Sequence, residues 1–194
     1  MELILIRHAH PLSEETKDRS PADPPLSRIG TQQARAVASW LARNPPDRLV
    51  SSPARRARDT AQVTALALSK DVAIDERLRD ANPTRERYVT LEDERARDPK
   101  AYRRRLEDYA SSRHLAEASV RVNAALDEWT AGHPGMRVAV FCHGSVVNVY
   151  AARVLGLAQL AFLQADYAST HRFMISRSAI RSVRSLNETA YLPN

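Results

Sequence analysis

Short apolar segments that alternate with helical patterns constrain the fold of this chain more than any other feature of its sequence. Residues 2–6 (ELILI) are too few for a core helix, and their bulky side chains suit a buried strand. Residues 48–52 (RLVSS), 71–75 (DVAID) and 137–142 (RVAVFC) have the same character. Strands that alternate with helices are typical of the α/β class. We therefore predict a doubly wound, mostly parallel sheet that is flanked by helices.

The helices between these strands have recognisable starts and ends. Ser27 is a good N-cap for a helix that Asn44-Pro45-Pro46 ends, and Ser52 with Pro53 predicts the start of a second helix. Further helices are predicted over residues 115–129 and 146–156, and two edge strands over residues 171–176 and 179–186.

Residues 76–112 interrupt this rhythm. They are highly charged, and Asp98-Pro99 is a helix start within them. We predict a helical insertion that covers the site. No segment of the 194 residues has the composition of a linker, so a single domain is expected over residues 1–194.

Composition excludes several classes of function. A net charge of +6 raises the question of nucleic acid, but the basic residues are spread along the chain and interleaved with acids, as in residues 93–98 (DERARD). We expect no nucleic-acid partner, only a mild preference for small anionic substrates.

Cys142 is the only cysteine, which excludes an intramolecular disulfide. No apolar run is long enough for a membrane helix, and residues 1–10 do not fit a signal peptide, so a cytoplasmic protein with no membrane partner is expected. The oligomeric state stays open.

Chemically important residues follow three of the predicted strands. Arg7 and His8 follow the first, Arg56 lies shortly after the second, and His143-Gly144 follows the fourth. Because ligands bind outside the carboxyl ends of parallel strands, two histidines and two arginines should meet at one edge of the sheet. Arginine suits phosphoryl oxygens, helix N-termini favour anions, and imidazole can act as a nucleophile. The residues indicate phosphoryl chemistry without a metal.

Four segments together resemble those of the histidine phosphatase superfamily, the phosphoglycerate mutase-like proteins. They are LIRHA (5–9), PLSRIGTQQA (25–34), SSPARRARDTAQ (51–62) and VAVFCHGSVV (138–147), and SLNETAYL (185–192) resembles the terminal segment of the family more faintly. The matches occur in the order of the family and span nearly the whole chain.

The resemblance implies a role for each matched residue. His8 would attack phosphorus and become a phosphohistidine, while Arg7, Arg56 and His143 would hold the phosphoryl oxygens. Gly144 would belong with these substrate-binding residues. No metal and no cofactor would be needed.

The same resemblance implies a general acid after the third strand. The family has a Leu-x-Glu pattern there, and this chain has Leu78-Arg79-Asp80, so Asp80 is the predicted proton donor. Glu76 and Glu86 are nearby alternatives that a loop could bring to the site.

The predicted function is a phosphatase that hydrolyses a small phosphomonoester. Alternatives are a phosphoglycerate-type mutase, which His10-Pro11 in place of the Glu-Thr of mutases disfavours, and a catalytically silent protein that binds phospho-ligands. A metal-dependent hydrolase using the His8-x-His10 pair is a third, but no carboxylate or cysteine motif completes its ligand set. His114, His133 and His171 are expected to be structural or at the surface, and Arg103-Arg104-Arg105 to form a solvated helix face.

Overall fold

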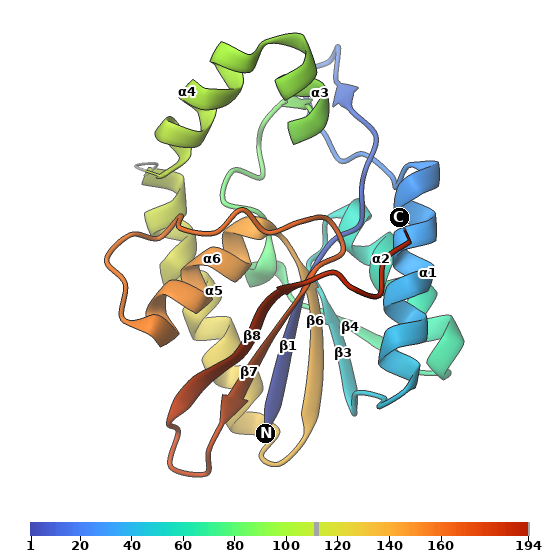
Figure 1. The fold of residues 1–194 in the computed structure, drawn as a ribbon, viewed down its shortest axis with the longest axis vertical. Coiled ribbons are helices and arrows are strands. Elements are labelled where there is room, and N and C mark those ends of the chain that lie inside the picture. Colours follow the sequence, from blue (N-terminus) through green and yellow to red (C-terminus); the bar gives the residue numbers. More distant parts are fainter. Residues whose placement is uncertain (111–112, 194) are drawn as a thin grey trace.

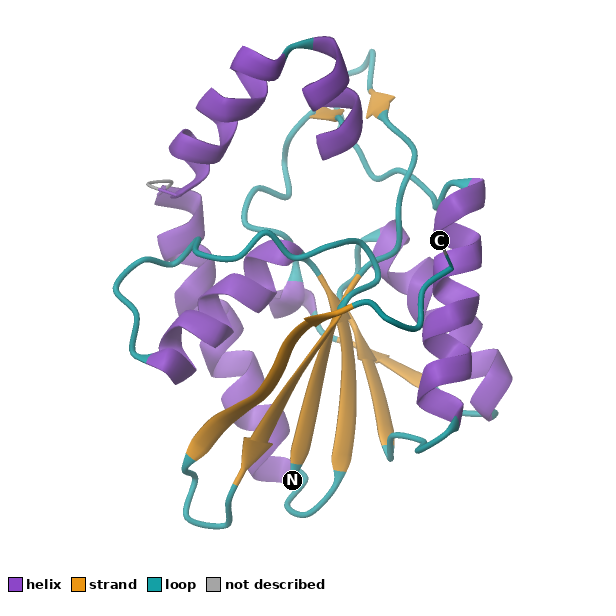
Figure 2. Cartoon of the chain, in the orientation of Figure 1, coloured by secondary structure: helices purple, strands orange, loops and turns teal. Residues whose placement is uncertain are grey.

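A six-stranded sheet with helices on both faces forms the body of the protein (Figures 1 and 2). The computed structural model describes residues 1–110 and 113–193. The strand order is β4-β3-β6-β1-β7-β8: the first four strands are parallel, β7 runs antiparallel to them, and β8 pairs antiparallel with β7. The predicted doubly wound, mostly parallel sheet is confirmed. The elements are β1 (Glu2–Arg7), β2 (Glu14–Glu15), α1 (Arg28–Ala42), β3 (Arg48–Ser51), α2 (Arg55–Leu68), β4 (Val72–Ile74), the 3-10 helix η1 (Glu76–Leu78), β5 (Arg87–Tyr88), α3 (Leu91–Arg97), α4 (Pro99–Ala110), α5 (Arg113–Gly132), β6 (Arg137–Cys142), α6 (Gly144–Leu155), β7 (Thr170–Ile175) and β8 (Arg181–Glu188).

Alternate residues of β1 face two separate hydrophobic layers. Leu3 and Leu5 pack in the core formed with α5 and α6, whereas Ile4 and Ile6 pack in the core formed with α1 and α2. All four side chains are fully buried, as period-two alternation requires of a strand covered on both faces. Cys142 lies in the α5–α6 core, and burial raises the pKa of its thiol to about 12.

The register of the parallel strands aligns their carboxyl ends. Arg7 lies opposite Cys142, and the backbone N–H of His8 donates to the carbonyl of Cys142 over 2.9 Å. On the other side of β6, the N–H of Ser52 donates to the carbonyl of Phe141, also over 2.9 Å. His8, Ser52 and the residue after Cys142 are therefore held at the same edge of the sheet.

Two helix starts show how capping works in this chain. Ser27 caps α1 as predicted, because its Oγ accepts from the N–H of Gly30. The predicted start at Ser52-Pro53 is wrong: α2 begins at Arg55, and its N-cap residue makes no side-chain hydrogen bond. Asp23 supplies the cap instead, because its Oδ1 and Oδ2 accept from the N–H of Arg55 over 2.8 and 3.0 Å.

The segment predicted as an insertion lies beyond the carboxyl ends of the strands. It contains η1, β5, α3 and α4, and the two α-helices arch over the sheet edge in Figure 1. Its strand β5 pairs with β2, which belongs to the loop after His8. The final two residues of the predicted range, 111–112, lie outside the described residues.

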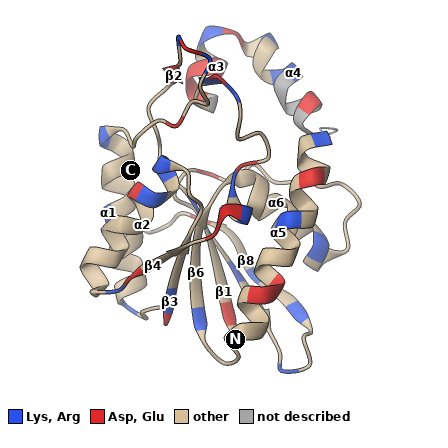
Figure 3. Ribbon diagram, turned by 180° about the vertical axis from the view of Figure 1, so that it is seen from behind, with Lys and Arg blue, Asp and Glu red and all other residues tan. Residues whose placement is uncertain are grey.

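Charged residues of both signs are interspersed along the ribbon, as Figure 3 shows from behind. Arg103 and Arg104 are exposed on α4, as expected of a solvated face. Within residues 1–110 and 113–193, no helix has the length and apolar character needed to cross a membrane.

Candidate active site

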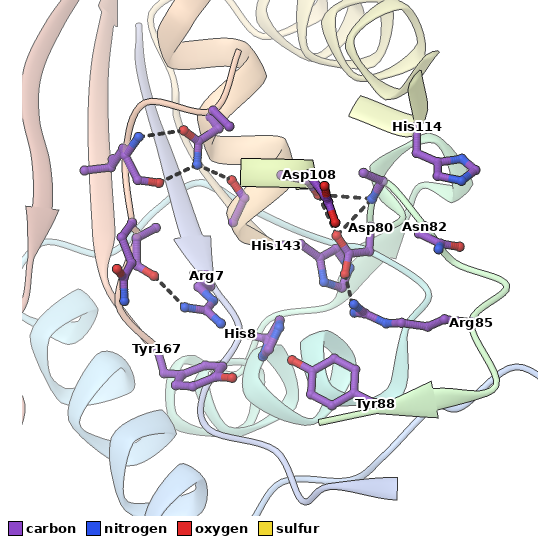
Figure 4. Close-up of a pocket in the computed structure, with 18 of the residues that line it drawn as sticks. Arg7, His8, Asp80, Asn82, Arg85, Tyr88, Asp108, His114, His143 and Tyr167 are labelled. Carbon is purple, nitrogen blue, oxygen red and sulfur yellow. Dashed lines mark hydrogen bonds and ion pairs between the residues drawn. The ribbon is translucent and has the colours of Figure 1, made fainter. Parts of the chain in front are cut away.

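A cavity of about 500 Å³ opens at the carboxyl edge of the sheet (Figure 4). Arg7, His8, Asp80, His143 and Gly144, all predicted from the sequence, line it. The other predicted site residue, Arg56, is 4% exposed and touches both histidines. The structure thus brings together every residue of the predicted set.

His8 is held in one tautomer by its two neighbours. Its Nδ1 lies 2.9 Å from the carbonyl oxygen of Ala9, which can only accept, so Nδ1 carries the proton. Its Nε2 accepts from Nε of Arg56 over 3.2 Å. Burial, followed by the charges of Arg56 and Arg7, holds the pKa of His8 well below its ordinary value. The imidazole is therefore neutral and has a lone pair on Nε2.

His143 sits against the same guanidinium, with its ring centroid 5.3 Å from that of His8. Its Nδ1 accepts from Nη2 of Arg56 over 3.3 Å, so Nε2 carries the proton and donates to Oγ of Ser52 over 2.8 Å. Burial and then the charge of Arg56 lower its pKa well below the ordinary value. In this neutral form His143 can donate a hydrogen bond only through Nε2.

Aromatic rings support the arginines of the site. The guanidinium carbon of Arg7 lies 3.7 Å from the ring centroid of Tyr167, and its Nη1 donates to the carbonyl of Ala165 over 2.5 Å. The guanidinium carbon of Arg56 lies 4.7 Å from the ring centroid of Tyr88. These stacked arrangements fix the planes of both cations beside His8.

Asp80 reaches the site from the loop after η1. Its Oδ1 accepts from Oγ of Ser145 over 2.7 Å and from the N–H of Ala81 over 2.9 Å. Its Oδ2 accepts from Nη2 of Arg85 over 2.6 Å and lies 3.4 Å from Nη2 of Arg56. Burial by itself would raise the pKa of the Asp80 carboxyl, but the arginine charges outweigh it and hold that pKa well below the usual range. The carboxylate is ionised in the free site.

The segment at residues 25–34 supports the loop that follows His8. Oγ of Ser27 donates to the carbonyl of His10 over 3.1 Å, and Oε1 of Gln33 accepts from the N–H of His10 over 2.9 Å. A Cβ on Gly30 would lie only 2.0 Å from the His10 carbonyl oxygen, so this position has no room for a side chain. Oγ1 of Thr60 accepts from the N–H of Ala9 over 3.0 Å.

Asn148 fixes the opposite wall of the cavity. Its Nδ2 donates to the carbonyls of Gly144 and Leu163 over 2.9 and 2.7 Å. Its Oδ1 accepts from the N–H groups of Phe162 and Leu163 over 3.0 and 2.9 Å. The loop at 161–165 is thereby attached to the first turns of α6.

The alternative proton donors lie away from the cavity. Glu76 is exposed and pairs with Arg79 over 2.7 Å, and Glu86 is also exposed. Neither carboxylate is among the residues that line the cavity. Asp80 does line it and lies beside Arg56. Asp23 also lies beside Arg56, with its Oδ1 3.5 Å from Nη1, but it is not a lining residue.

The other histidines have different surroundings. His133 stacks on Trp129, and burial lowers the pKa of His171 to about 3, so both have the structural role expected of them. His114 is exposed, as expected, and it also lines the cavity because α5 begins at Arg113, beside the site. His10 bonds to Oγ of Ser27 over 2.9 Å, and no group of three or more metal-ligating side chains occurs in the described part of the chain.

Sequence reasoning missed several residues of the site. Ser145 directly follows His143-Gly144, so its place in that segment was a usable signal. Tyr88 and Tyr167 carry no such signal, because they contact Arg56 and Arg7, which are far away in the chain. Arg85 carries none either, because its contacts with Asp80 and Tyr88 lie within one irregular loop.

Comparisons with known proteins agree with this geometry. The sequence profile of the histidine phosphatase superfamily (branch 1) matches residues 3–189. The bifunctional protein Rv2228c of Mycobacterium tuberculosis is 31% identical over 98% of this chain and 54% of its own length, so this chain spans about half of that relative. The probable phosphoglycerate mutase GpmB of Escherichia coli is 28% identical over 81% of this chain and 76% of its own length.

Solved structures show the same fold. The mycobacterial glucosyl-3-phosphoglycerate phosphatase Rv2419c superposes with a TM-score of 0.77 at 23% identity, covering 97% of this chain and 99% of its own. The phosphoserine phosphatase of Entamoeba histolytica gives a TM-score of 0.77 at 22% identity, covering 99% of both chains. The profile match over nearly the whole sequence confirms the resemblance found in the motifs: this chain belongs to the histidine phosphatase superfamily, branch 1.

Proposed function

We propose that this chain is a phosphatase that hydrolyses a small phosphomonoester through a phosphohistidine on His8. The observation that carries the proposal is the buried, neutral His8, whose Nε2 lone pair faces Arg56 beside the cavity. The membership of this chain in the histidine phosphatase superfamily supports the same reaction. Two solved structures with the same fold, which are named as phosphatases, also support it.

In the first step, Nε2 of His8 attacks phosphorus and the bond from phosphorus to the leaving oxygen breaks. Arg7, Arg56 and His143 contact the other phosphoryl oxygens, and the N–H of Gly144 at the start of α6 adds a further donor. These cations and dipoles already supply the positive field that a phosphoryl group requires. The proposed reaction therefore uses no metal and no cofactor.

Asp80 acts as the general acid in the first step and as the general base in the second. As an acid it protonates the leaving oxygen, and as a carboxylate it then takes a proton from the water that attacks the phosphohistidine. The second step releases inorganic phosphate and returns His8 to its neutral form and Asp80 to its acid form. Its place beside Arg56 and at the cavity surface supports this role.

The phosphohistidine is the intermediate to trap. Rapid quenching with a ³²P-labelled phosphomonoester should leave acid-labile, alkali-stable label on the wild-type protein and none on His8→Ala. The turnover number of His8→Ala should fall by at least about 1,000-fold, the scale seen when a nucleophile is lost.

His133→Ala is the matched control, because His133 stacks on Trp129 away from the cavity. It should label and turn over like the wild type. A folded His8→Ala variant that keeps near-normal turnover would contradict the proposal. Transfer of the label to a phosphoglycerate acceptor instead of water would identify a mutase.

A further inference from the structure

The Asp80 carboxylate is fully occupied in the free site. Oδ1 accepts from Ser145 and from the N–H of Ala81, and Oδ2 accepts from Arg85 and Arg56. A protonated carboxyl becomes a donor at one oxygen, and a donor cannot face a guanidinium. The Ser145 hydroxyl can turn to accept from Oδ1, but a proton on Oδ2 cannot face both guanidinium groups. At least one of the two arginines must therefore leave before Oδ2 can carry a proton to the substrate.

Arg85 is the partner that is free to move. Ser145 is 2% exposed, and Arg56 is 4% exposed and also bonded to both histidines of the site. The Arg85 side chain is 25% exposed and lines the cavity. In Figure 4 it extends across the cavity to reach the carboxylate of Asp80.

Asp80, in contrast, is fixed by its backbone. Nη2 of Arg121 donates to the Asp80 carbonyl over 2.6 Å, and Nη1 donates to the carbonyls of Arg77 and Arg79 over 2.6 and 2.7 Å. The ion pair between Asp80 and Arg85 can therefore open by movement of the Arg85 side chain alone.

The ring of Tyr88 contacts Arg85 while Arg85 pairs with Asp80. The guanidinium carbons of Arg85 and Arg56 lie 4.4 and 4.7 Å from the same ring centroid. The backbone of Arg85 is held by its carbonyl, which accepts from Ala22 N–H over 2.9 Å. A guanidinium can thus rotate over the ring toward a phosphoryl group beside Arg56 without losing its aromatic contact.

We propose that Arg85 controls proton delivery by Asp80: it occupies Oδ2 in the free site and moves to the substrate phosphoryl group when substrate binds. The inference rests on the proposed function. Substrate binding frees Oδ2, which takes a proton from the monoanionic phosphate ester or from water. That proton passes to the leaving oxygen as the phosphorus–oxygen bond breaks. Water then returns a proton to Asp80, and release of phosphate lets Arg85 pair with Oδ2 again and expel the proton to solvent.

Arg85 belongs to a larger set of charged and titratable groups that face Asp80. The others come from three elements and the strand end beside them. They are Arg56 of α2, Arg121 of α5, Cys142 at the end of β6 and His143 at the start of α6. Among the cations bonded to the Asp80 carboxylate, Arg85 can be removed without loss of the His8–Arg56–His143 contacts, whereas Arg56 cannot.

The first test measures the protonation of Asp80 directly. ¹³C NMR of labelled aspartate carboxyls, with Asp80→Asn used for assignment, gives its titration midpoint. In Arg85→Gln we expect Asp80 to titrate at least about one pH unit higher than in the wild type, because an opposite charge within hydrogen-bonding distance is lost. Arg85→Lys should restore most of the difference. Arg87→Gln is the matched control, since Arg87 is 56% exposed and pairs with Glu15 outside the cavity.

The second test compares two leaving groups across pH. For glycerol 2-phosphate, whose alcohol needs a proton, the kcat/KM profile of Arg85→Gln should move to higher pH by the same interval. For p-nitrophenyl phosphate, which needs none, its shape should not change. An unchanged Asp80 midpoint in folded Arg85→Gln, or equal slowing of both substrates at every pH, would overturn the inference. A wild-type protein that forms no phosphohistidine would contradict the proposed function instead, so the two failures are told apart.

Discussion

Gly30→Ala is the smallest change that tests how the loop after His8 is held. The new Cβ would lie 2.0 Å from the carbonyl oxygen of His10, and 2.9 Å from its carbonyl carbon. Both partners are backbone atoms, so no rotamer change can relieve the contact. The N-terminus of α1 and the His10 segment must separate by at least 1.0 Å to reach 3.0 Å, still a short contact.

The expected losses of stability and activity follow from this displacement. Overpacking by one methyl group costs about 1–3 kcal/mol, and each hydrogen bond lost from Ser27 or Gln33 to His10 adds about 1 kcal/mol. We expect the free energy of unfolding to fall by about 3 kcal/mol. Because His8 lies two residues before His10, a shift of about 1 Å should lower kcat/KM about 100-fold.

Urea denaturation followed by circular dichroism measures the first effect, and p-nitrophenyl phosphate hydrolysis the second. Gly132→Ala is the matched control. A Cβ at Gly132, the last residue of α5, meets nothing within 4 Å, so this change should be neutral or stabilise by up to about 1 kcal/mol. A Gly30→Ala protein that is as stable and as active as the wild type would refute the reasoning.

Three further predictions concern chemistry and pH. Asp80→Asn should slow hydrolysis of an alkyl phosphate by at least about 100-fold but that of p-nitrophenyl phosphate little, and equal effects on both would remove Asp80 as the acid. Exhaustive EDTA treatment should leave the rate unchanged, whereas a loss that only zinc or magnesium reverses would indicate a metallohydrolase. Burial lowers the pKa values of His8, His143 and His171. Below pH 6.5 the unfolded chain therefore binds more protons than the folded protein. The contribution of these histidines to the free energy of unfolding is constant above that pH and is lost below it. Each histidine should cost about 1.4 kcal/mol per pH unit, and unfolding curves that are identical at pH 7 and pH 5.5 would contradict this.

The sequence allowed the sheet and the centre of the site to be predicted because both have local signals. The buried strands are continuous apolar runs, and Arg7, His8 and His143 directly follow two of them. The cap of α2 could not be predicted, because Asp23 is 32 residues before the N–H that it accepts from. Arg85 was missed for a different reason, although it is only five residues from Asp80. Its contact with Asp80 depends on how a charged, non-periodic loop folds back, and neither hydrophobic spacing nor turn composition records that.

The hydrogen bonds of Asn148 make one wall of the cavity unsuitable for redesign. Its amide uses both donors and accepts twice to attach residues 161–165 to α6, so that wall moves only if the helix moves. Another part of the wall comes from the segment at 80–89, which Arg121 of α5 and backbone bonds from Thr16 and Ala22 hold in place. To change which alcohol is accepted, Asn82 and Val89 of this wall are therefore the positions to vary, while Arg85, Tyr88 and the Asn148 wall are kept.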